Sequence, residues 1–441
     1  MKLDYKKTFL LGFGFFGVSV VWSVYNSFVP IFLREYALPW WLVGFVMTFD
    51  NIAGIIIQPY VGQLSDHTRT RFGRRMPYIM IGAPIAALTF ALIPVLHTGL
   101  PHTGTTLGLM TAIIVIMNIG MAIFRTPVVA LMPDITPSAL RSKANGIINL
   151  MGGLGTAIAF LIGGVLYNIN QGVPFYAMTI LMVLAELLVV NIIREPKEFT
   201  VAAGQKAKPP SFGDSLRETV QTVVDIARQE EKSALFICLA IFAWFMGYNA
   251  IETFWTSYGK EVLYASQIAS GALTADQAVA KATTLLSVVP IVFLVMSLPA
   301  GFIATRFGRK RTIITGLLLL AVFWLAIFFV QNMMFVYAAL VFSGIGWALI
   351  NINSLPIVVD LASAAKVGSY TGLYYFFSML AATLSPPIVG WLMDAFGLSV
   401  MFIFTPVFML LAALLMLGVK RSEPVPEVPG VKPAAVGEAQ S

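Results

Sequence analysis

The chain has 441 residues, of which 58% are hydrophobic and 11% are charged, and its formal net charge is +7. A soluble domain is roughly 45–50% apolar and about 25% charged, so this composition excludes a soluble globular fold. The apolar runs are long and lack a two-residue alternation. They therefore predict helices, which satisfy their own backbone hydrogen bonds in lipid.

Hydropathy predicts twelve membrane-spanning helices and hence an all-α membrane protein. The first span is too long for the apolar core of a cleaved signal, so we expect it to stay in the protein. The predicted spans cover residues 9–33, 41–63, 77–97, 107–131, 145–168, 174–193, 233–256, 282–304, 312–330, 334–356, 368–393 and 396–419.

Basic residues predict the orientation of these spans. Most of the 28 Lys and Arg residues fall at the N-terminus and in every second connection after it. Because Lys and Arg concentrate in cytoplasmic loops, we expect both termini on the cytoplasmic side of the plasma (inner) membrane. The positive net charge follows from this sidedness and gives no reason to expect a nucleic-acid partner.

A charged segment in the middle of the chain divides the spans into two sets of six. We expect an N-terminal bundle at 1–193, a cytoplasmic linker at 194–232, a C-terminal bundle at 233–419 and a disordered cytoplasmic tail at 420–441. The apolar residues of the linker fall on one helical face, which predicts either an amphipathic helix on the inner leaflet or an ordinary linker helix. They are Phe212, Leu216, Val220, Val223 and Val224.

The two halves resemble each other in sequence. Tyr25-Asn26 recurs as Tyr248-Asn249, and "RFGRR" at 71–75 recurs as "RFGRK" at 306–310. Further pairs share a constant offset of 226 positions: Gly120 with Gly346, Asp134 with Asp360, Gly146 with Gly372, and Gly164 with Gly390. The repeat predicts two pseudo-symmetric six-helix bundles with a binding site between them.

The stretch "GQLSDHTRTRFGRRMPY" at 62–78 falls between the second and third spans. It resembles the loop signature of the major facilitator superfamily, G-x-x-x-D followed by G-R-[RK], although four extra residues separate the two parts. Its residues are Gly62, Asp66, Arg71, Gly73, Arg74 and Arg75, and the counterparts in the second half are Gly301, Arg306, Gly308 and Arg309, with Thr305 in place of the acid.

The longer spacing and "FRTPVVALMPDI" in the fourth span resemble the sucrose-transporter and solute carrier family 45 branch, close to the glycoside–pentoside–hexuronide symporters. The resemblance implies that the loop is an inner gate, in which Asp66 caps a helix end of the other half near Ser369 and Tyr370. The alternative is that its arginines only anchor the hairpin, since each costs about 2.5–3.5 kcal/mol in hydrocarbon.

Three ionisable residues within the spans are candidates for ion coupling: Asp50, Arg125 and Glu252. An ionisable side chain at membrane depth is costly and by default functional, and carboxylates near an arginine can take up and release a proton. We expect the proton as the coupling ion, with Na⁺ as the alternative. The competing interpretations are a structural ion pair for Asp50 and Arg125 and a solvated vestibule position for Glu252.

The substrate cavity is predicted from the spans that line it in this superfamily, the first, fourth, seventh and tenth. A sugar needs polar groups for its hydroxyls and flat aromatic faces for its C–H surface. Candidates are Trp22, Tyr25, Asn26, Trp244, Tyr248, Asn249 and Asn351. Trp and Tyr also occur at membrane interfaces, which is the competing interpretation.

Catalytic and metal-binding motifs are not recognisable in the sequence. The chain has one cysteine and three histidines, so we expect no disulfide, no metal cluster and no cofactor, and we expect His97 and His102 to be solvated. The sequence therefore predicts a monomeric secondary active transporter that carries a glycoside, such as sucrose or maltose, together with a proton. The alternatives are an exporter of amphipathic or drug-like molecules and a non-transporting sensor on the same fold.

Overall fold

A computed structural model describes residues 4–136, 140–195, 231–330, 332–361 and 367–420, with isolated positions between 221 and 228. The side chains of 141–143 and 367–369 are not among those described. Most of the predicted linker helix and nearly all of the predicted tail therefore lie outside the described residues.

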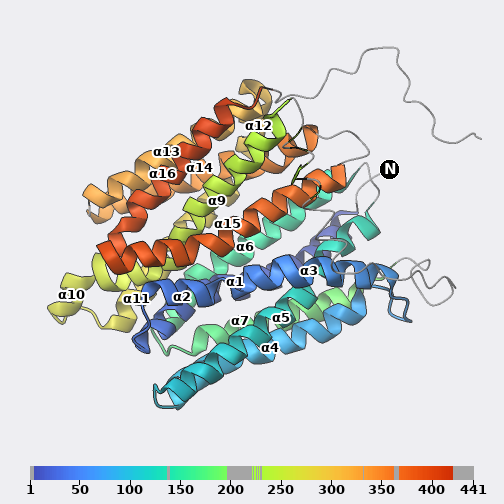
Figure 1. Cartoon of the computed structure of the whole chain (residues 1–441). Coiled ribbons are helices and arrows are strands. Elements are labelled where there is room, and N and C mark those ends of the chain that lie inside the picture. The colour runs from blue at the N-terminus through green and yellow to red at the C-terminus, as the bar shows by residue number, and fades with distance from the viewer. Residues whose placement is uncertain are drawn as a thin grey trace, which may run out of the picture.

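The described residues form an all-helical bundle in which 12 helices are long and apolar enough to cross a membrane, as predicted (Figure 1). Two of these spans are built from two helices each. The helices are α1 (Tyr5–Glu35), α2 (Trp40–Met47), α3 (Phe49–His67), α4 (Met76–Gly99), α5 (Gly104–Ile135), α6 (Arg141–Tyr167), α7 (Val173–Ile192), α9 (Ser233–Tyr258), the π-helical turn η3 (Gly259–Leu263), α10 (Ala265–Ala269), α11 (Ala275–Leu286), α12 (Val288–Phe307), α13 (Arg309–Phe329), α14 (Met333–Asp360), α15 (Val367–Phe396), the 3₁₀ turn η5 (Leu398–Val400) and α16 (Met401–Leu417).

The second span of each half is interrupted. Thr48 separates α2 from α3, and its hydroxyl donates to the carbonyl of Phe45 at 2.7 Å. Ser287 separates α11 from α12 in the same way, and its hydroxyl donates to the carbonyl of Thr284 at 2.6 Å. The first interruption places Asp50 in the first turn of α3.

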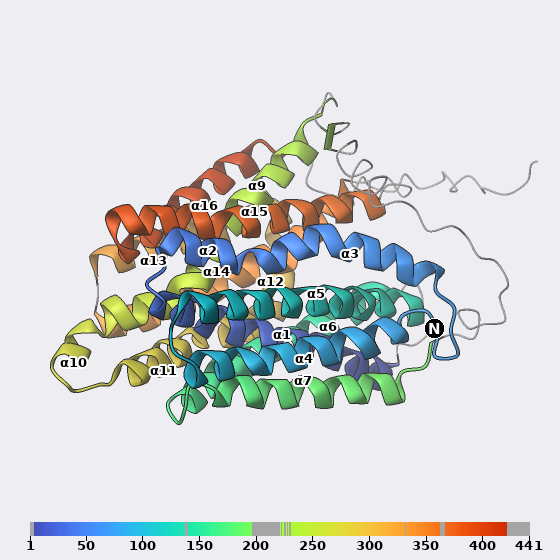
Figure 2. The same cartoon turned by 60° about the horizontal axis from the view of Figure 1, so that its bottom comes forward.

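The helices α1–α7 and α9–α16 form two six-span bundles that lie side by side (Figures 1 and 2). Three pairs of spans join the halves: α1 with α9, α2 and α3 with α15, and α6 with α11 and α12. The last two contacts are equivalent under the repeat, because each pairs the second span of one half with the fifth span of the other. The arrangement is the pseudo-twofold architecture expected from the sequence.

Glycines allow the two halves to touch at equivalent positions. A Cβ on Gly390 would lie 2.4 Å from the carbonyl oxygen of Trp40, and a Cβ on Gly164 would lie 2.6 Å from that of Ala280. Any larger residue would force the helices apart, because the obstructing atoms belong to the backbone. The matching pair of Gly164 and Gly390 is thus explained by packing between the halves.

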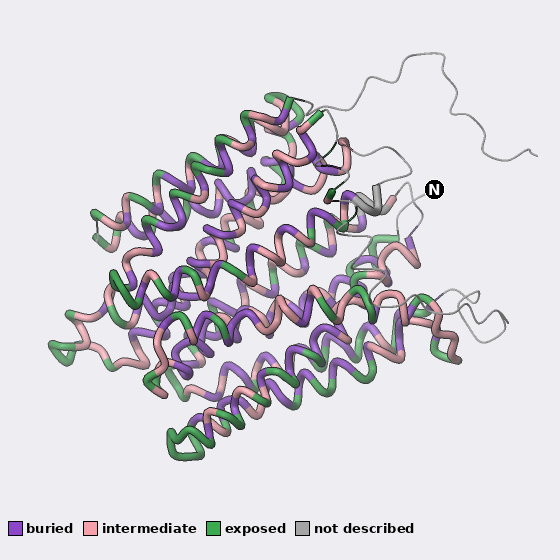
Figure 3. The backbone as a smooth tube through the Cα atoms, viewed as in Figure 1, coloured by how far each residue is buried: buried purple, intermediate pink, exposed green. Residues whose placement is uncertain are grey.

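Exposed and partly buried residues alternate with buried ones along the helices, as the green, pink and purple segments show (Figure 3), and many of the exposed residues are large and apolar. Leu88, Val322 and Leu414 are each more than 60% exposed on their helices. Such exposure would be unfavourable in water but matches the hydrocarbon of a bilayer.

Candidate functional site

A large cavity lies between the two bundles and has a volume of about 3020 Å³. Its lining includes Tyr5, Gln63, Arg306 and Lys420, which lie at the end of the molecule that carries the arginine-rich loops. We call this the basic end and the opposite one the far end. The cavity reaches the basic end, so the structure is open there.

Of the predicted site residues, Arg125 and Asn351 line this cavity directly. The two are equivalent under the 226 offset. Tyr375 of α15 also lines the cavity and interacts electrostatically with Arg125. A cationic group from one half thus faces a phenol and an amide from the other half across the cavity.

Asp50 lies between two other ionisable residues, Arg125 and Glu252. Asp50 interacts electrostatically with both Arg125 and Glu252, and its carboxylate accepts from the backbone and side-chain amides of Asn51 at 2.7 and 2.6 Å. Glu252 accepts from the side-chain amide of Asn26 at 3.5 Å. The three ionisable residues predicted from the sequence therefore form one cluster, to which both halves contribute.

One face of α1 is directed toward this cluster. Between Phe16 and Leu33 every residue is buried except Ser19, Trp22 and Asn26. Their spacing of three and four residues places them on a single helical face, and Ser19 lines the cavity. Tyr25 is fully buried, with its ring edge-on to that of Trp22.

The predicted residues of α9 have different surroundings. Tyr248 is partly exposed, and its ring stacks on that of Trp347 with centroids 3.8 Å apart. Asn249 donates its amide to the carbonyl of Phe245 at 2.7 Å. Trp244 has no exposed surface and packs in the core of the C-terminal half, so the structure does not bring it to the cavity.

Several polar cavity residues were not singled out from the sequence: Gln58, Asn145, Asn149 and Tyr375. Asn145 and Asn149 are four residues apart on α6, and this spacing was the available signal. No sequence signal marked Tyr375, because tyrosines are common in membrane helices. These residues bring amide and hydroxyl groups to a cavity that Phe293, Leu294 and Met379 also line.

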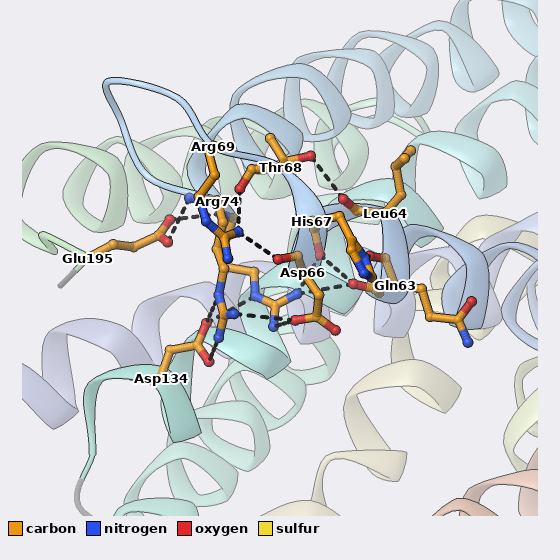
Figure 4. A network of polar contacts seen from close by, with 12 residues as sticks. Gln63, Leu64, Asp66, His67, Thr68, Arg69, Arg74, Asp134 and Glu195 are labelled. Carbon is orange, nitrogen blue, oxygen red and sulfur yellow. Dashed lines mark hydrogen bonds and ion pairs between the residues drawn. The ribbon is translucent and has the colours of Figure 1, made fainter. Parts of the chain in front are cut away.

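At the basic end, the arginine-rich loop is held by a polar network of Asp66, Arg74, Arg75, Asp134 and Glu195 (Figure 4). Arg74 donates to Asp134 through Nε at 3.1 Å and Nη2 at 2.5 Å, and Arg75 donates to the same carboxylate at 3.0 Å. Arg75 also pairs with Asp66. The network thus joins the loop to the end of α5.

Glu195 completes this network and was missed by the sequence reasoning. Its carboxylate accepts from the backbone N–H groups of Arg74, Arg75 and Met76 at 2.8, 2.8 and 3.0 Å. It therefore caps the start of α4, where a negative charge is favourable. Gly73 has a φ of +110°, and a Cβ there would lie 2.4 Å from the Glu195 carboxyl carbon, so glycine is required.

In this structure Asp66 binds arginines of its own half, namely Arg74 and Arg75. The structure does not test the predicted cap by Asp66 on the other half, because the side chain of Ser369 lies outside the described residues. Arg71 rests over the Phe72 ring, with Cζ 4.6 Å from the ring centroid.

The second half carries a simpler version of the same arrangement. Arg309 pairs with Asp360. In the first half, Arg74 pairs with Asp134, which is the equivalent of Asp360 under the repeat. Gly308 has a φ of +86° between α12 and α13. The other predicted residues there are in more open surroundings: Arg306 lies over the Phe307 ring at 5.5 Å, and a Cβ on Gly301 would meet nothing within 4 Å. In the first half, a Cβ on Gly62 would touch Thr126 at 3.4 Å.

The two halves meet at the far end. Asp394 of α15 accepts from the backbone N–H groups of Trp40 and Trp41 at 2.9 and 3.0 Å, and so caps α2 of the other half. Lys260 lies 3.3 Å from Glu35, and Arg34 lies 4.0 Å from Glu261. These contacts close the cavity on the side opposite to its opening.

The histidines at the far end differ from their prediction. His97 is 2% exposed, so the expectation that it is solvated was wrong, because its ring stacks on Phe32 with centroids 3.9 Å apart. His102 is exposed, as expected. The structure also gathers Glu35, His97 and His102 into a group whose ligand atoms lie within 4.8 Å of one another, a proximity that the sequence did not predict.

Two six-span bundles around a polar cavity that is open at one end and closed at the other define a membrane transport protein. The chain matches the profile of the Major Facilitator Superfamily over residues 11–280 and 272–439. It belongs to this superfamily and is a secondary transporter.

Solved structures of similar fold cover nearly the whole chain. The nucleoside transporter NupG aligns over 95% of this chain and 100% of its own, with a TM-score of 0.70 and 13% identity. A bacterial homologue of the human lysosomal transporter Spinster aligns over 95% of this chain and 98% of its own, with a TM-score of 0.68 and 14% identity. At these identities the likeness concerns the fold alone.

Sequence relatives match over shorter stretches. The quinolone resistance protein NorA of Staphylococcus aureus is 24% identical over 204 residues, which are 46% of this chain and 49% of NorA. The proton-associated sugar transporter A of Mus musculus is 28% identical over 157 residues, 34% of this chain and 21% of the mouse protein. The matches thus span half or less of each relative.

Proposed function

We propose that the protein is a proton-coupled symporter of a polar, uncharged organic solute, namely a glycoside such as sucrose or maltose. The observation that carries this proposal is the cluster of Asp50, Arg125 and Glu252 between the halves. Asp50 interacts with the guanidinium of Arg125 and with the carboxylate of Glu252, so the cluster holds two acids and one cation. Within a membrane, the smallest group that can neutralise the second acid is a proton.

The surroundings of the cluster support a neutral polar substrate. The amides of Asn149 and Asn351 and the hydroxyl of Tyr375 line the cavity and can donate to and accept from sugar hydroxyls. The stacked pair of Tyr248 and Trp347 offers an aromatic face on the same side as Glu252, one helical turn away. The printed name of the mouse relative, a proton-associated sugar transporter, agrees with the sucrose-transporter branch that the loop sequence resembles.

The test is uptake by proteoliposomes that contain the purified full-length protein. A panel of radiolabelled mono- and disaccharides is offered with and without an imposed pH gradient, and a Na⁺ gradient is the parallel arm. We expect at least one glycoside to accumulate only with the pH gradient, and a protonophore to abolish the accumulation. Accumulation driven by Na⁺ alone would identify Na⁺, and not the proton, as the coupling ion. The absence of sugar uptake under every gradient would overturn the proposal.

A second candidate is export of amphipathic or drug-like molecules. It is favoured by the similarity to NorA and by the apolar part of the cavity, where Phe293, Leu294 and Met379 lie. Export predicts that everted vesicles accumulate a fluorescent amphipathic dye when acidified inside. If the same vesicles do not transport sugars, export of drug-like molecules replaces sugar symport as the proposed function.

The orientation is also a proposal. Because basic loops face the cytoplasm, the basic end is placed in the cytosol, and the structure is then inward-open. The same orientation assigns the Asp66, Arg74 and Arg75 network to the inner gate. Labelling of an introduced cysteine with a membrane-impermeant maleimide tests it: in intact cells, Phe72→Cys should stay unlabelled and Gly104→Cys should react.

The expected chain divisions follow from the same proposal. We assign residues 1–193 and 233–419 to the two rocking bundles, 194–232 to a cytoplasmic linker and 420–441 to a cytoplasmic tail. Each bundle carries its own copy of the loop motif, so a monomer contains all parts of the alternating cycle.

A further inference from the structure

The far end of the molecule holds a group of potential metal ligands that plays no part in the proposed coupling cluster. Glu35 ends α1, His97 lies in the last turn of α4, and His102 lies in the short loop before α5. The Glu35 Oε2 and His97 Nε2 atoms are 3.2 Å apart. Ligand atoms around a tetrahedral Zn²⁺ bound at about 2.0–2.2 Å have a similar separation.

The histidine rings are held in place by aromatic neighbours. His97 stacks on Phe32 at 3.9 Å and on His102 at 4.7 Å between centroids. The His102 ring also lies 4.7 Å from that of Tyr36, and its Nε2 bonds to the backbone oxygen of His97 at 3.0 Å. The ligands are therefore ordered before any ion binds, which lowers the entropic cost of binding.

One ring nitrogen in this group lacks a partner. The side chain of His97 is 1% exposed, and its Nδ1 has no hydrogen-bond partner among the described residues. A neutral imidazole carries its proton on one ring nitrogen, so with that proton on Nδ1 the Nε2 atom that faces Glu35 keeps its lone pair for a metal ion. Two imidazoles and one carboxylate are the donor set that Zn²⁺ and related transition metals prefer.

We propose that Glu35, His97 and His102 form a binding site for a divalent transition metal at the far end, with Zn²⁺ as the best match. All three ligands belong to the N-terminal half. The Oε1 atom of Glu35 instead lies 3.3 Å from the ammonium group of Lys260 in the other half. One carboxylate is thus shared between the metal site and a contact that closes the far end.

The shared carboxylate couples metal binding to that closing contact. A dication on Oε2 draws charge from Glu35 and repels the Lys260 ammonium, so the metal weakens the contact between the halves. By linkage, the contact weakens metal binding by the same factor. In the proposed orientation, extracellular Zn²⁺ would then shift the protein toward the state open at the far end, and the remaining pair of Arg34 and Glu261 would oppose this shift.

The experiment is isothermal titration of the purified full-length protein with ZnCl₂ in detergent, with an affinity tag that contains no histidine. We expect one bound Zn²⁺ per chain, and Co²⁺ in its place should give the visible absorption of tetrahedral coordination. His102→Ala, Glu35→Gln and His97→Ala should each weaken binding by about 100-fold or more, because losing even an outer-shell partner costs 10–100-fold.

The third histidine provides a matched control. His67 lies at the basic end, where its Nδ1 is bonded to the carbonyl of Gln63 at 2.8 Å, so His67→Ala should leave Zn²⁺ binding unchanged. Lys260→Met should tighten it, since the competing cation is removed. His102 is exposed on a loop, so its replacement tests the site even if His97→Ala does not fold. Equal Zn²⁺ affinity in the wild type and His102→Ala would overturn the proposal, as would affinity lost in His67→Ala.

Discussion

The side-chain amide of Asn26 donates to the carboxylate of Glu252 at 3.5 Å, and these residues are 226 positions apart. The same offset relates the glycines and aspartates of the two halves. Under that offset Asn26 and Glu252 are equivalent, although the match of Tyr25-Asn26 with Tyr248-Asn249 uses an offset of 223, and their contact joins the first spans of the two halves. A neutral amide in one half faces an acid in the other, which concentrates the negative charge at the point where the bundles meet.

Asp50→Asn should abolish accumulation driven by a pH gradient, because a carboxamide cannot bind and release a proton. Exchange of the transported sugar across the membrane should survive, since it does not require net proton movement. Proteoliposomes measure both quantities, as gradient-driven uptake and as counterflow. Undiminished accumulation would show that Asp50 has a structural role only.

Glu252→Gln should likewise reduce gradient-driven uptake at least tenfold, because it removes the carboxylate shared by Asn26 and the coupling cluster. Glu186→Gln is the matched control. Glu186 is also a buried carboxylate within a span, but it lies against Gly17 of α1 and has no hydrogen-bond partner among the described residues. Its replacement should leave transport intact, and equal losses in both variants would contradict a specific role for Glu252.

Asp134→Asn should lower the thermal stability of the protein. Two arginines share this carboxylate, whose side chain is 8% exposed, and breaking a buried pair costs about 3–5 kcal/mol. Asp360→Asn should cost less, about 1 kcal/mol or below, because Arg309 and Asp360 are partly exposed at 34% and 21%. Tryptophan fluorescence during heating in detergent gives both melting temperatures, and the reverse order would refute this reasoning.

Gly44→Ala should disfavour the state seen here. A Cβ on Gly44 would lie 2.2 Å from the carbonyl oxygen of Pro386 in α15, and such overpacking costs about 1–3 kcal/mol. An Asn149→Cys reporter in the cavity, in a Cys238→Ala background, should then react more slowly with maleimide from the basic end. Gly372→Ala is the control, because its Cβ would meet nothing within 4 Å, and it should not change the rate.

The sequence predicts the twelve spans because an apolar run of sufficient length is enough to identify a membrane-spanning helix. It also predicts the cluster of Asp50, Arg125 and Glu252, since charges inside a membrane are rare enough to stand out. It does not predict the interruptions at Thr48 and Ser287, because neither is a proline or a glycine. At each interruption the hydroxyl donates to the carbonyl three residues earlier, a contact that the sequence alone does not reveal.

Helix caps supplied by distant parts of the chain also cannot be predicted from the sequence. Asp394 caps α2 from more than 350 positions away, and Glu195 caps α4 from beyond the sixth span. Helical spacing put Trp244 on one face with Tyr248, but spacing cannot show which part of that face a neighbouring helix covers. Trp244 is covered completely, whereas Tyr248 keeps some exposed surface.

The paired charges at the far end bear on the origin of the chain. Arg34 and Lys260 are equivalent under the repeat, as are Glu35 and Glu261, and each cation meets the acid of the opposite half. A six-helix ancestor with a basic residue followed by glutamate at this helix end would have bound a second copy of itself through two identical contacts. Gene duplication would then have joined two subunits that already fitted together, leaving later substitutions free to differentiate their interiors.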